Sequence, residues 1–198
     1  MGGYGSDALH FLVTTLFDLY VMVVALRFLM QWVRADYYNP VAQFVVKATS
    51  PLLNPLRRMI PGWGGLDLAA LVLAIALLVL KLLILQAMDL GVVRISGSMV
   101  TLAQAGIGSV LIVAMVELLA LLFNIAFFAI IIQAVLSWVS PGQYNPVGAL
   151  LNSLTRPLLG PIQRFVPPIG GLDLSPLVAL IGLQVAKMLV IPPLLTLA

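Results

Sequence analysis

The chain has 198 residues, of which 62% are hydrophobic and 9% are charged, and its mean hydropathy is +1.14. Soluble domains carry about 25% charged residues, so this composition excludes a soluble globular, a disordered or a collagen-like protein. The net charge is only +3, and the ten basic residues are spread along the chain, which argues against nucleic-acid binding. The composition therefore indicates an integral membrane protein.

The cysteine and histidine counts limit the chemistry of the chain. It has no cysteine and one histidine, His10. Disulfides, cysteine-ligated metals and multi-histidine metal or haem sites are therefore excluded within one chain. We expect no metal, no cofactor and no catalytic residues, because no set of nucleophile, base and metal ligands converges in the sequence.

Four segments are long and apolar enough to cross a bilayer. They cover residues 9–33, 66–88, 107–139 and 172–195, and their apolar runs are continuous, which favours helices over a barrel. The long loops after the first and third segments carry basic residues and, over 37–66 and 140–172, no acidic residue. The positive-inside rule therefore predicts that both loops lie in the cytoplasm and both termini outside.

The chain contains an internal duplication with an offset of 106 residues. Tyr-Asn-Pro-Val at 38–41 recurs at 144–147, and Gly-Gly-Leu-Asp-Leu at 64–68 recurs at 170–174. Each unit holds two spans, so both units enter the membrane in the same orientation. We expect an all-α membrane protein with four transmembrane helices in two parallel αα repeats, residues 1–92 and 107–198, joined by a short connector over 93–106.

These motifs resemble the YggT family of bacterial inner-membrane proteins. The resemblance rests on Tyr-Asn-Pro at 38–40, Ser-Pro-Leu-Leu-Asn-Pro-Leu-Arg-Arg-Met-Ile-Pro at 50–61 and Gly-Gly-Leu-Asp-Leu at 64–68, and it recurs in the second unit. YlmG-type proteins look like single-unit relatives. The second unit departs from the motif at Gly160 and Gln163, where the first has Asn54 and Arg57.

The resemblance implies a multi-pass protein of the bacterial inner (plasma) membrane, with no established enzyme activity. It further implies a membrane factor linked to envelope or osmotic-stress phenotypes. In the relatives it implies division or nucleoid phenotypes, or cytochrome-complex assembly. It supplies no set of catalytic residues.

Each long loop carries an amphipathic pattern. Apolar residues recur at helical spacing at 41, 44, 45 and 48, and the second unit keeps this register at 147, 150, 151 and 154. We expect Pro51 and Pro55 to break the helix, and Asn54 to cap a short second helix that stops by Pro61.

These segments are expected to lie in the cytoplasmic headgroup layer. Two alternatives remain open: the basic residues are ordinary positive-inside anchors without lipid preference, or they form a docking surface for a partner protein. The residues expected to contact anionic lipid are Lys47, Arg57, Arg58, Arg156 and Arg164.

Asp67 and Asp173 follow Gly-Gly-Leu at the start of the second and fourth spans. A carboxylate at this position accepts hydrogen bonds from the free N–H groups of the first helical turn. We therefore expect helix caps here, in preference to an ion or substrate site. The glycines do not form a phosphate loop, because no Gly-Lys-Ser/Thr follows.

Ionisable and amide groups also lie inside the predicted spans, namely Asp18, Lys81, Asn124 and Lys187. A charge near the bilayer centre costs at least about 2.5 kcal/mol, so these residues are functional candidates. By helical rise, Asp18 and Lys81 each lie roughly 21 Å from the loop end, and Asn124 and Lys187 are their repeat mates. We expect Asp18 to pair with Lys81 or Lys187. Glu117 would reach Lys187 only if that lysine extends outward.

Two functions fit this pattern. The first is a non-enzymatic accessory or scaffold protein for envelope, osmotic-stress or membrane-complex homeostasis. The alternative is a small ion or osmolyte transporter or channel component that uses the intramembrane charges. The expected partners are the lipid bilayer, including anionic lipid, and an unknown membrane protein. Two helices per unit make a thin bundle, so a homo-oligomer also fits the sequence.

Overall fold

The structure, a computed structural model, describes residues 4–62, 64–90, 92–95, 98–101, 105–139, 145–166 and 173–197. For residues 92–95, 98 and 138 only the backbone is described. The elements in chain order are α1 (Tyr4–Trp32), α2 (Pro40–Met59), α3 (Leu68–Ala87), β1 (Val92–Ile95), β2 (Ser98–Thr101), α4 (Ile107–Val139), α5 (Pro146–Phe165) and α6 (Ser175–Leu195).

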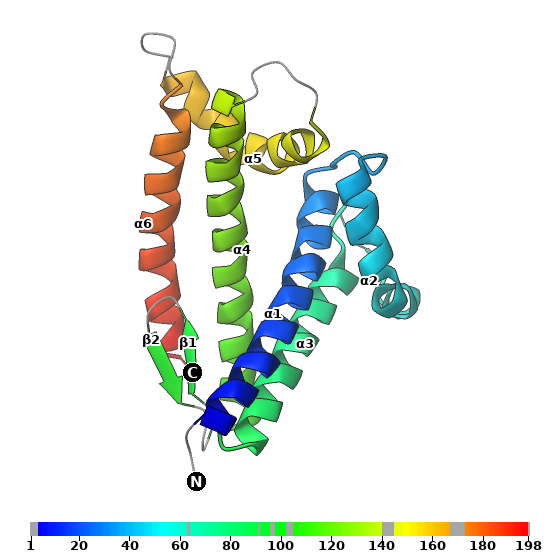
Figure 1. Cartoon of the computed structure of the whole chain (residues 1–198), viewed down its shortest axis with the longest axis vertical. Coiled ribbons are helices and arrows are strands. Elements are labelled where there is room, and N and C mark those ends of the chain that lie inside the picture. Colours follow the sequence, from blue (N-terminus) through cyan, green and yellow to red (C-terminus); the bar gives the residue numbers. More distant parts are fainter. Residues whose placement is uncertain are drawn as a thin grey trace.

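Helices α1, α3, α4 and α6 are the four membrane spans, which confirms the predicted fold class. In Figure 1, α1 lies beside α3 and α4 beside α6, and these two pairs are the cores of the two repeats. The shorter helices α2 and α5 lie at one end of the bundle. Helix α1 begins and α6 ends at the opposite end, near the β1–β2 hairpin.

The two repeats meet chiefly where α3 packs against α4. One cluster of buried side chains runs through this joint and includes Val24 of α1, Leu78 and Leu82 of α3, and Val113 of α4. Figure 1 shows the helix pairs close together near the termini and apart near α2 and α5. Most large side chains of α6 face outward, as expected for a helix at the lipid-facing edge of a bundle.

The connector between the repeats forms an antiparallel hairpin, in which Val92 pairs with Thr101 and Ile95 with Ser98. We did not expect strands in this segment. Valine, isoleucine and threonine make up most of its paired positions, and such β-branched residues favour extended backbone. The hairpin joins the repeats at the end where the termini lie.

Helices α2 and α5 each continue through two internal prolines, Pro51 and Pro55 in α2. The prediction that these prolines end the helix, with Asn54 capping a second one, is wrong. Each proline removes one intrahelical hydrogen bond and crowds the preceding turn, which bends a helix that packing holds together. The Ser50 hydroxyl also donates to the Val46 carbonyl at 2.6 Å, a contact that favours bending. Figure 1 shows α2 changing direction along its length.

Asparagines cap the first turns of α2 and α5. The side-chain oxygens of Asn39 and Asn145 each accept the N–H two residues later at 2.9 Å, and a proline follows each at the first helical position. The Nδ2 of Asn39 also donates to the Pro146 carbonyl at 2.6 Å. The repeated Tyr-Asn-Pro motif is therefore a capping motif, and its first copy also joins the two repeats.

Candidate functional site

A buried ionic cluster joins three of the membrane spans. The Nζ of Lys81 on α3 lies 2.7 Å from Oδ1 of Asp18 on α1, and it also contacts Oε1 of Glu117 on α4. The Lys81 side chain is 1% exposed, whereas that of Asp18 is 53% exposed. The pairing of Asp18 with Lys81 inside the first repeat is confirmed.

Glu117 brings the second repeat into this cluster. The sequence offered Lys187 as a partner of Glu117 only on the condition that this lysine extends outward. In the structure α4 packs against α3, and Glu117 contacts Lys81. Its second oxygen, Oε2, is buried and has no hydrogen-bond partner among the described residues. Two carboxylates from different repeats therefore surround one ammonium group.

The second repeat contains a counterpart with different charge. The Nζ of Lys187 donates to Oδ1 of Asn124 at 2.7 Å, and the two residues are 63 apart in sequence, as are Asp18 and Lys81. Asn124 is exposed and Lys187 is half-buried. Among the residues that the structure describes, Lys187 has no carboxylate partner. The repeats thus share the pair geometry but differ in the charge of the partners.

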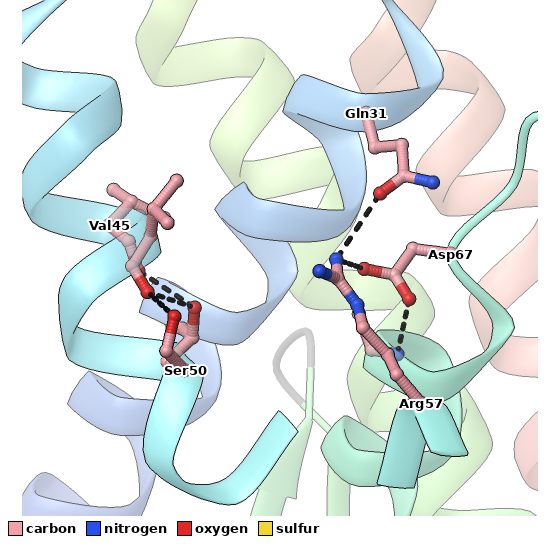
Figure 2. A network of polar contacts seen from close by, with 8 residues as sticks. Gln31, Val45, Ser50, Arg57 and Asp67 are labelled. Atoms are coloured by element: carbon pink, nitrogen blue, oxygen red, sulfur yellow. Dashed lines mark hydrogen bonds and ion pairs between the residues drawn. The ribbon is translucent and has the colours of Figure 1, made fainter. Parts of the chain in front are cut away.

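A second polar cluster closes the first repeat near α2 (Figure 2). Arg57 of α2 forms an ion pair with Oδ2 of Asp67 and donates to Oε1 of Gln31 on α1 at 3.3 Å. Oδ1 of the buried Asp67 accepts the N–H of Ala70 at 3.2 Å, which makes Asp67 the predicted cap of α3. This cluster ties α1, α2 and the start of α3 together. Arg57 therefore points toward Asp67, although we expected it to contact lipid.

In the corresponding cluster of the second repeat, the aspartate Asp173 has a neutral partner, Gln163, in place of an arginine. Gln163 donates to Oδ2 of Asp173 at 2.9 Å, and Oδ1 accepts the N–H of Ser175 at 2.8 Å. Helix α6 begins at Ser175 with Leu174 at the cap position, so Asp173 lies one residue earlier than predicted. Burial raises the pKa of Asp173, but the hydrogen bonds from Ser175 and Gln163 outweigh it and hold this pKa below its usual value. Residues 167–172, which include the second Gly-Gly-Leu, lie outside the described residues.

The remaining basic residues predicted to contact lipid are all exposed on α2 and α5; they are Lys47, Arg58, Arg156 and Arg164. Helix α2 also buries one apolar face, which includes Val45 and Leu53, against the bundle. A separate apolar face, with Phe44 and Met59, is exposed. A helix with buried, apolar and basic faces suits the headgroup layer of a membrane.

Arg27 is a buried residue that we did not select from the sequence. It is 7% exposed, its Cζ lies 5.0 Å from the centre of the Tyr37 ring, and its Nε and Nη1 have no hydrogen-bond partner in the described ranges. Its repeat mate Gln133 instead donates to Asn152 at 3.2 Å and accepts the Thr155 hydroxyl. An arginine within a span whose repeat mate is uncharged was the available signal in the sequence.

Three cavities lined by described residues open near α2 and α5. Neither Asp18, Lys81 nor Glu117 lines any of these three. The ionic cluster therefore lies apart from these three cavities. Its geometry is suited to holding α1, α3 and α4 together.

The comparison with protein families identifies both repeats. The CCB3/YggT family model matches residues 6–88 and again residues 112–194. The two matches are offset by 106 residues, the offset of the internal duplication. The hairpin lies between them. No solved structure matches the chain significantly.

Several bacterial proteins are similar along nearly their whole length. An uncharacterized protein of Pseudomonas aeruginosa is 48% identical over 192 residues, which cover 96% of this chain and 91% of the relative. An uncharacterized protein from the proC 3′ region of Vibrio alginolyticus is 44% identical, with 92% and 93% covered. The uncharacterized protein YggT of Escherichia coli is 37% identical, with 92% and 88% covered. The chain therefore belongs to the CCB3/YggT family.

Proposed function

We propose that this protein is a non-enzymatic accessory or scaffold protein of the bacterial inner membrane, acting in envelope, osmotic-stress or membrane-complex homeostasis. The observation that carries the proposal is the neutralisation of Lys81 by carboxylates from both repeats. A buried lysine with two anionic contacts stabilises the arrangement of its helices only while all partners are present. It does not present a free charge to a passing solute. The intramembrane charges are thus assigned a structural role.

The proposed interaction surface is formed by α2 and α5. Phe44 and Met59 are exposed on α2 together with the basic residues Lys47 and Arg58, and Phe165 is exposed on α5 next to Arg164 in the sequence. Such a surface suits both anionic headgroups and an adjacent membrane protein. By the positive-inside rule, α2 and α5 face the cytoplasm and both termini lie outside.

A transporter or channel component for ions or osmolytes is the second candidate. Two observations favour it: Asp18 is half-exposed, and Oε2 of Glu117, beside the same lysine, has no hydrogen-bond partner among the described residues. Adjacent acidic groups within a membrane are typical of proton and ion pathways. In this candidate, Asp18 and Lys81 line a pathway, and Asn124 and Lys187 line its counterpart in the second repeat.

Flux measurements in proteoliposomes separate the two candidates. The wild type is compared with a neutral variant carrying Asp18→Asn, Lys81→Met and Glu117→Gln, once thermal unfolding shows that the variant is folded. The scaffold proposal predicts no flux of protons, potassium, sodium, chloride or glycine betaine above that of empty liposomes. Wild-type flux that disappears in the folded neutral variant would establish the transporter instead.

Site-specific photo-cross-linking in cells tests for a partner at the proposed surface. A photoreactive residue replaces Phe44 on α2, and the control position is the exposed Val185 on α6. The scaffold proposal predicts a discrete protein adduct at position 44 that is absent at position 185. Equal labelling at both positions would contradict a specific partner surface on α2.

A further inference from the structure

An apolar cavity of about 330 Å³ lies between the two repeats. Its walls come from the second half of α1, the middle of α4, and parts of α5 and α6, so it occupies the region where the helix pairs diverge in Figure 1. Every lining residue is apolar or aromatic. They include Phe28, Leu29, Trp32, Leu122, Phe123 and Ala126.

A basic cavity of about 420 Å³ adjoins the apolar one at the α5 end. Val33 and Pro157 line both cavities, so the two share a wall. Arg156 and Arg164 line the basic cavity together with Ser153. Both arginines are exposed, and within the described part of the chain neither has an ion-pair partner. Unneutralised positive charge therefore lies next to an apolar groove.

The same arrangement is not repeated in the first unit. The repeat mate of Arg156 is the neutral Ser50, whereas Arg164 has the exposed Arg58 as its mate. Gly160 replaces the first repeat's asparagine, and a Cβ at this glycine would meet open space. The second repeat thus has a charge at Arg156 that the first lacks, and it leaves room at Gly160.

We infer that the two cavities together bind one anionic glycerophospholipid, with its phosphate at Arg156 and Arg164 and an acyl chain in the apolar groove. Arginine binds phosphate oxygens through paired N–H donors, and an acyl chain matches the apolar walls. A free phosphate would leave the groove unused, and an apolar peptide would leave both arginines without a counter-charge. The bound lipid would occupy the space between the two repeats where the helix pairs diverge. The inference rests on the proposed lipid contacts of α5 but not on the scaffold role.

Fluorescence quenching tests this site, because Trp32 lines the groove. The Trp63→Phe, Trp138→Phe background leaves Trp32 as the only tryptophan. This protein is placed in phosphatidylcholine bilayers that contain a small, equal fraction of brominated phosphatidylglycerol or brominated phosphatidylcholine. We expect brominated phosphatidylglycerol to quench Trp32 at least threefold more strongly, since it is enriched at the site.

Two charge variants on this background are the matched pair. Arg156→Gln with Arg164→Gln abolishes the preference for phosphatidylglycerol, whereas Arg34→Gln with Arg94→Gln, which removes the same charge outside α2 and α5, keeps it. Gly160→Phe fills the basic cavity without changing its charge and is expected to reproduce the loss. Equal quenching by both brominated lipids, or equal loss in both charge variants, would overturn the inference.

Soluble glycerol 3-phosphate distinguishes a lipid from a free phosphate as the ligand. We expect millimolar glycerol 3-phosphate to leave the quenching by brominated phosphatidylglycerol unchanged, because it lacks the acyl chain. Relief of quenching by this soluble anion would show that the site selects phosphate alone. Such a result would contradict the role assigned to the apolar groove.

Discussion

The two repeats place a lysine at the same position of their second span and neutralise it differently. Lys81 contacts two carboxylates and is 1% exposed, whereas Lys187 has the amide of Asn124 and is half-buried. The duplication preserved the pair geometry within each repeat. The difference has two sources: Asn124 replaces the carboxylate of Asp18, and α4 covers α3 and supplies Glu117, while α6 lies at the edge. A buried charge in this fold therefore depends on a third helix.

The largest expected effect comes from removing the buried lysine. Lys81→Met leaves Asp18 and Glu117 without a cation, and we expect the free energy of unfolding to fall by about 3–5 kcal/mol. Lys187→Met is the control in the second repeat. Its partner is a neutral amide, so we expect a change below about 1 kcal/mol. Unfolding in mixed micelles measures both, and equal losses would remove the distinction between the repeats.

The next largest loss of stability is expected from breaking the polar cluster of Arg57, Asp67 and Gln31. Arg57→Met leaves the buried Asp67 with the Ala70 N–H as its side-chain partner among the described residues, and we expect a loss of about 2 kcal/mol in unfolding free energy. Gln163→Met, at the exposed Asp173, is expected to cost less than about 0.5 kcal/mol. Arg57→Gln should recover part of the loss, since Gln163 already reaches its aspartate at 2.9 Å. No recovery would show that the charge of Arg57, and not its hydrogen bond, is what Asp67 requires.

The capping asparagines Asn39 and Asn145 allow the two repeats to be compared at the end of the bundle where α2 and α5 lie. Asn145→Ala removes a helix cap, which costs about 1 kcal/mol. Asn39→Ala removes the equivalent cap and also the hydrogen bond to the Pro146 carbonyl, so we expect about 2 kcal/mol. Thermal unfolding of the two variants under one set of conditions gives the difference. A larger effect for Asn145→Ala would contradict the inter-repeat role of Asn39.

A smaller effect is expected from making the second repeat resemble the first. Asn124→Asp places a carboxylate beside Lys187 at the existing hydrogen-bond position. We expect a gain of about 1 kcal/mol in unfolding free energy, because a hydrogen bond between charged groups is stronger than one to an amide. Asn124→Leu is the control and should not stabilise the protein. A loss of stability in Asn124→Asp would contradict a favourable ion pair at this position.

The smallest effect is a pH dependence at Asp173. Its pKa is lowered in the folded protein, so the carboxylate stabilises the fold at pH values above its unfolded pKa of about 3.9. That contribution is lost as the pH falls through the lower folded pKa. Asp173→Asn should therefore flatten the decline of Tm on acidification below about pH 4. An unchanged slope would contradict the assigned hydrogen bonds.

The four spans, the duplication and the Asp18–Lys81 pair were predictable from sequence. Continuous apolar runs define spans, and helical rise fixes the relative depth of two residues within one repeat. Helical rise does not give the relative depth of two residues in different repeats, because the helix pairs are tilted relative to each other in Figure 1. For this reason the sequence did not predict that Glu117, two turns outward of Asn124 along α4, contacts Lys81.

Other differences arise where packing overrides a local preference. Proline rules predict a break at Pro51, but burial of Val45 and Leu53 on one face keeps α2 continuous through the bend. The start of α6 differs from the predicted cap by one residue, since helix boundaries are the least defined feature of a sequence pattern. The β1–β2 hairpin is too short to give a strong periodic signal.

A double-mutant cycle between Lys81 and Glu117 tests most directly whether this cluster joins the two repeats. Unfolding free energies are measured for the wild type, Lys81→Met, Glu117→Gln and the double variant. The structure predicts a coupling energy of at least about 1.5 kcal/mol, because the two groups are in contact and buried. A coupling energy near zero would show that Glu117 contributes nothing to holding Lys81, and the cluster would then not join the repeats.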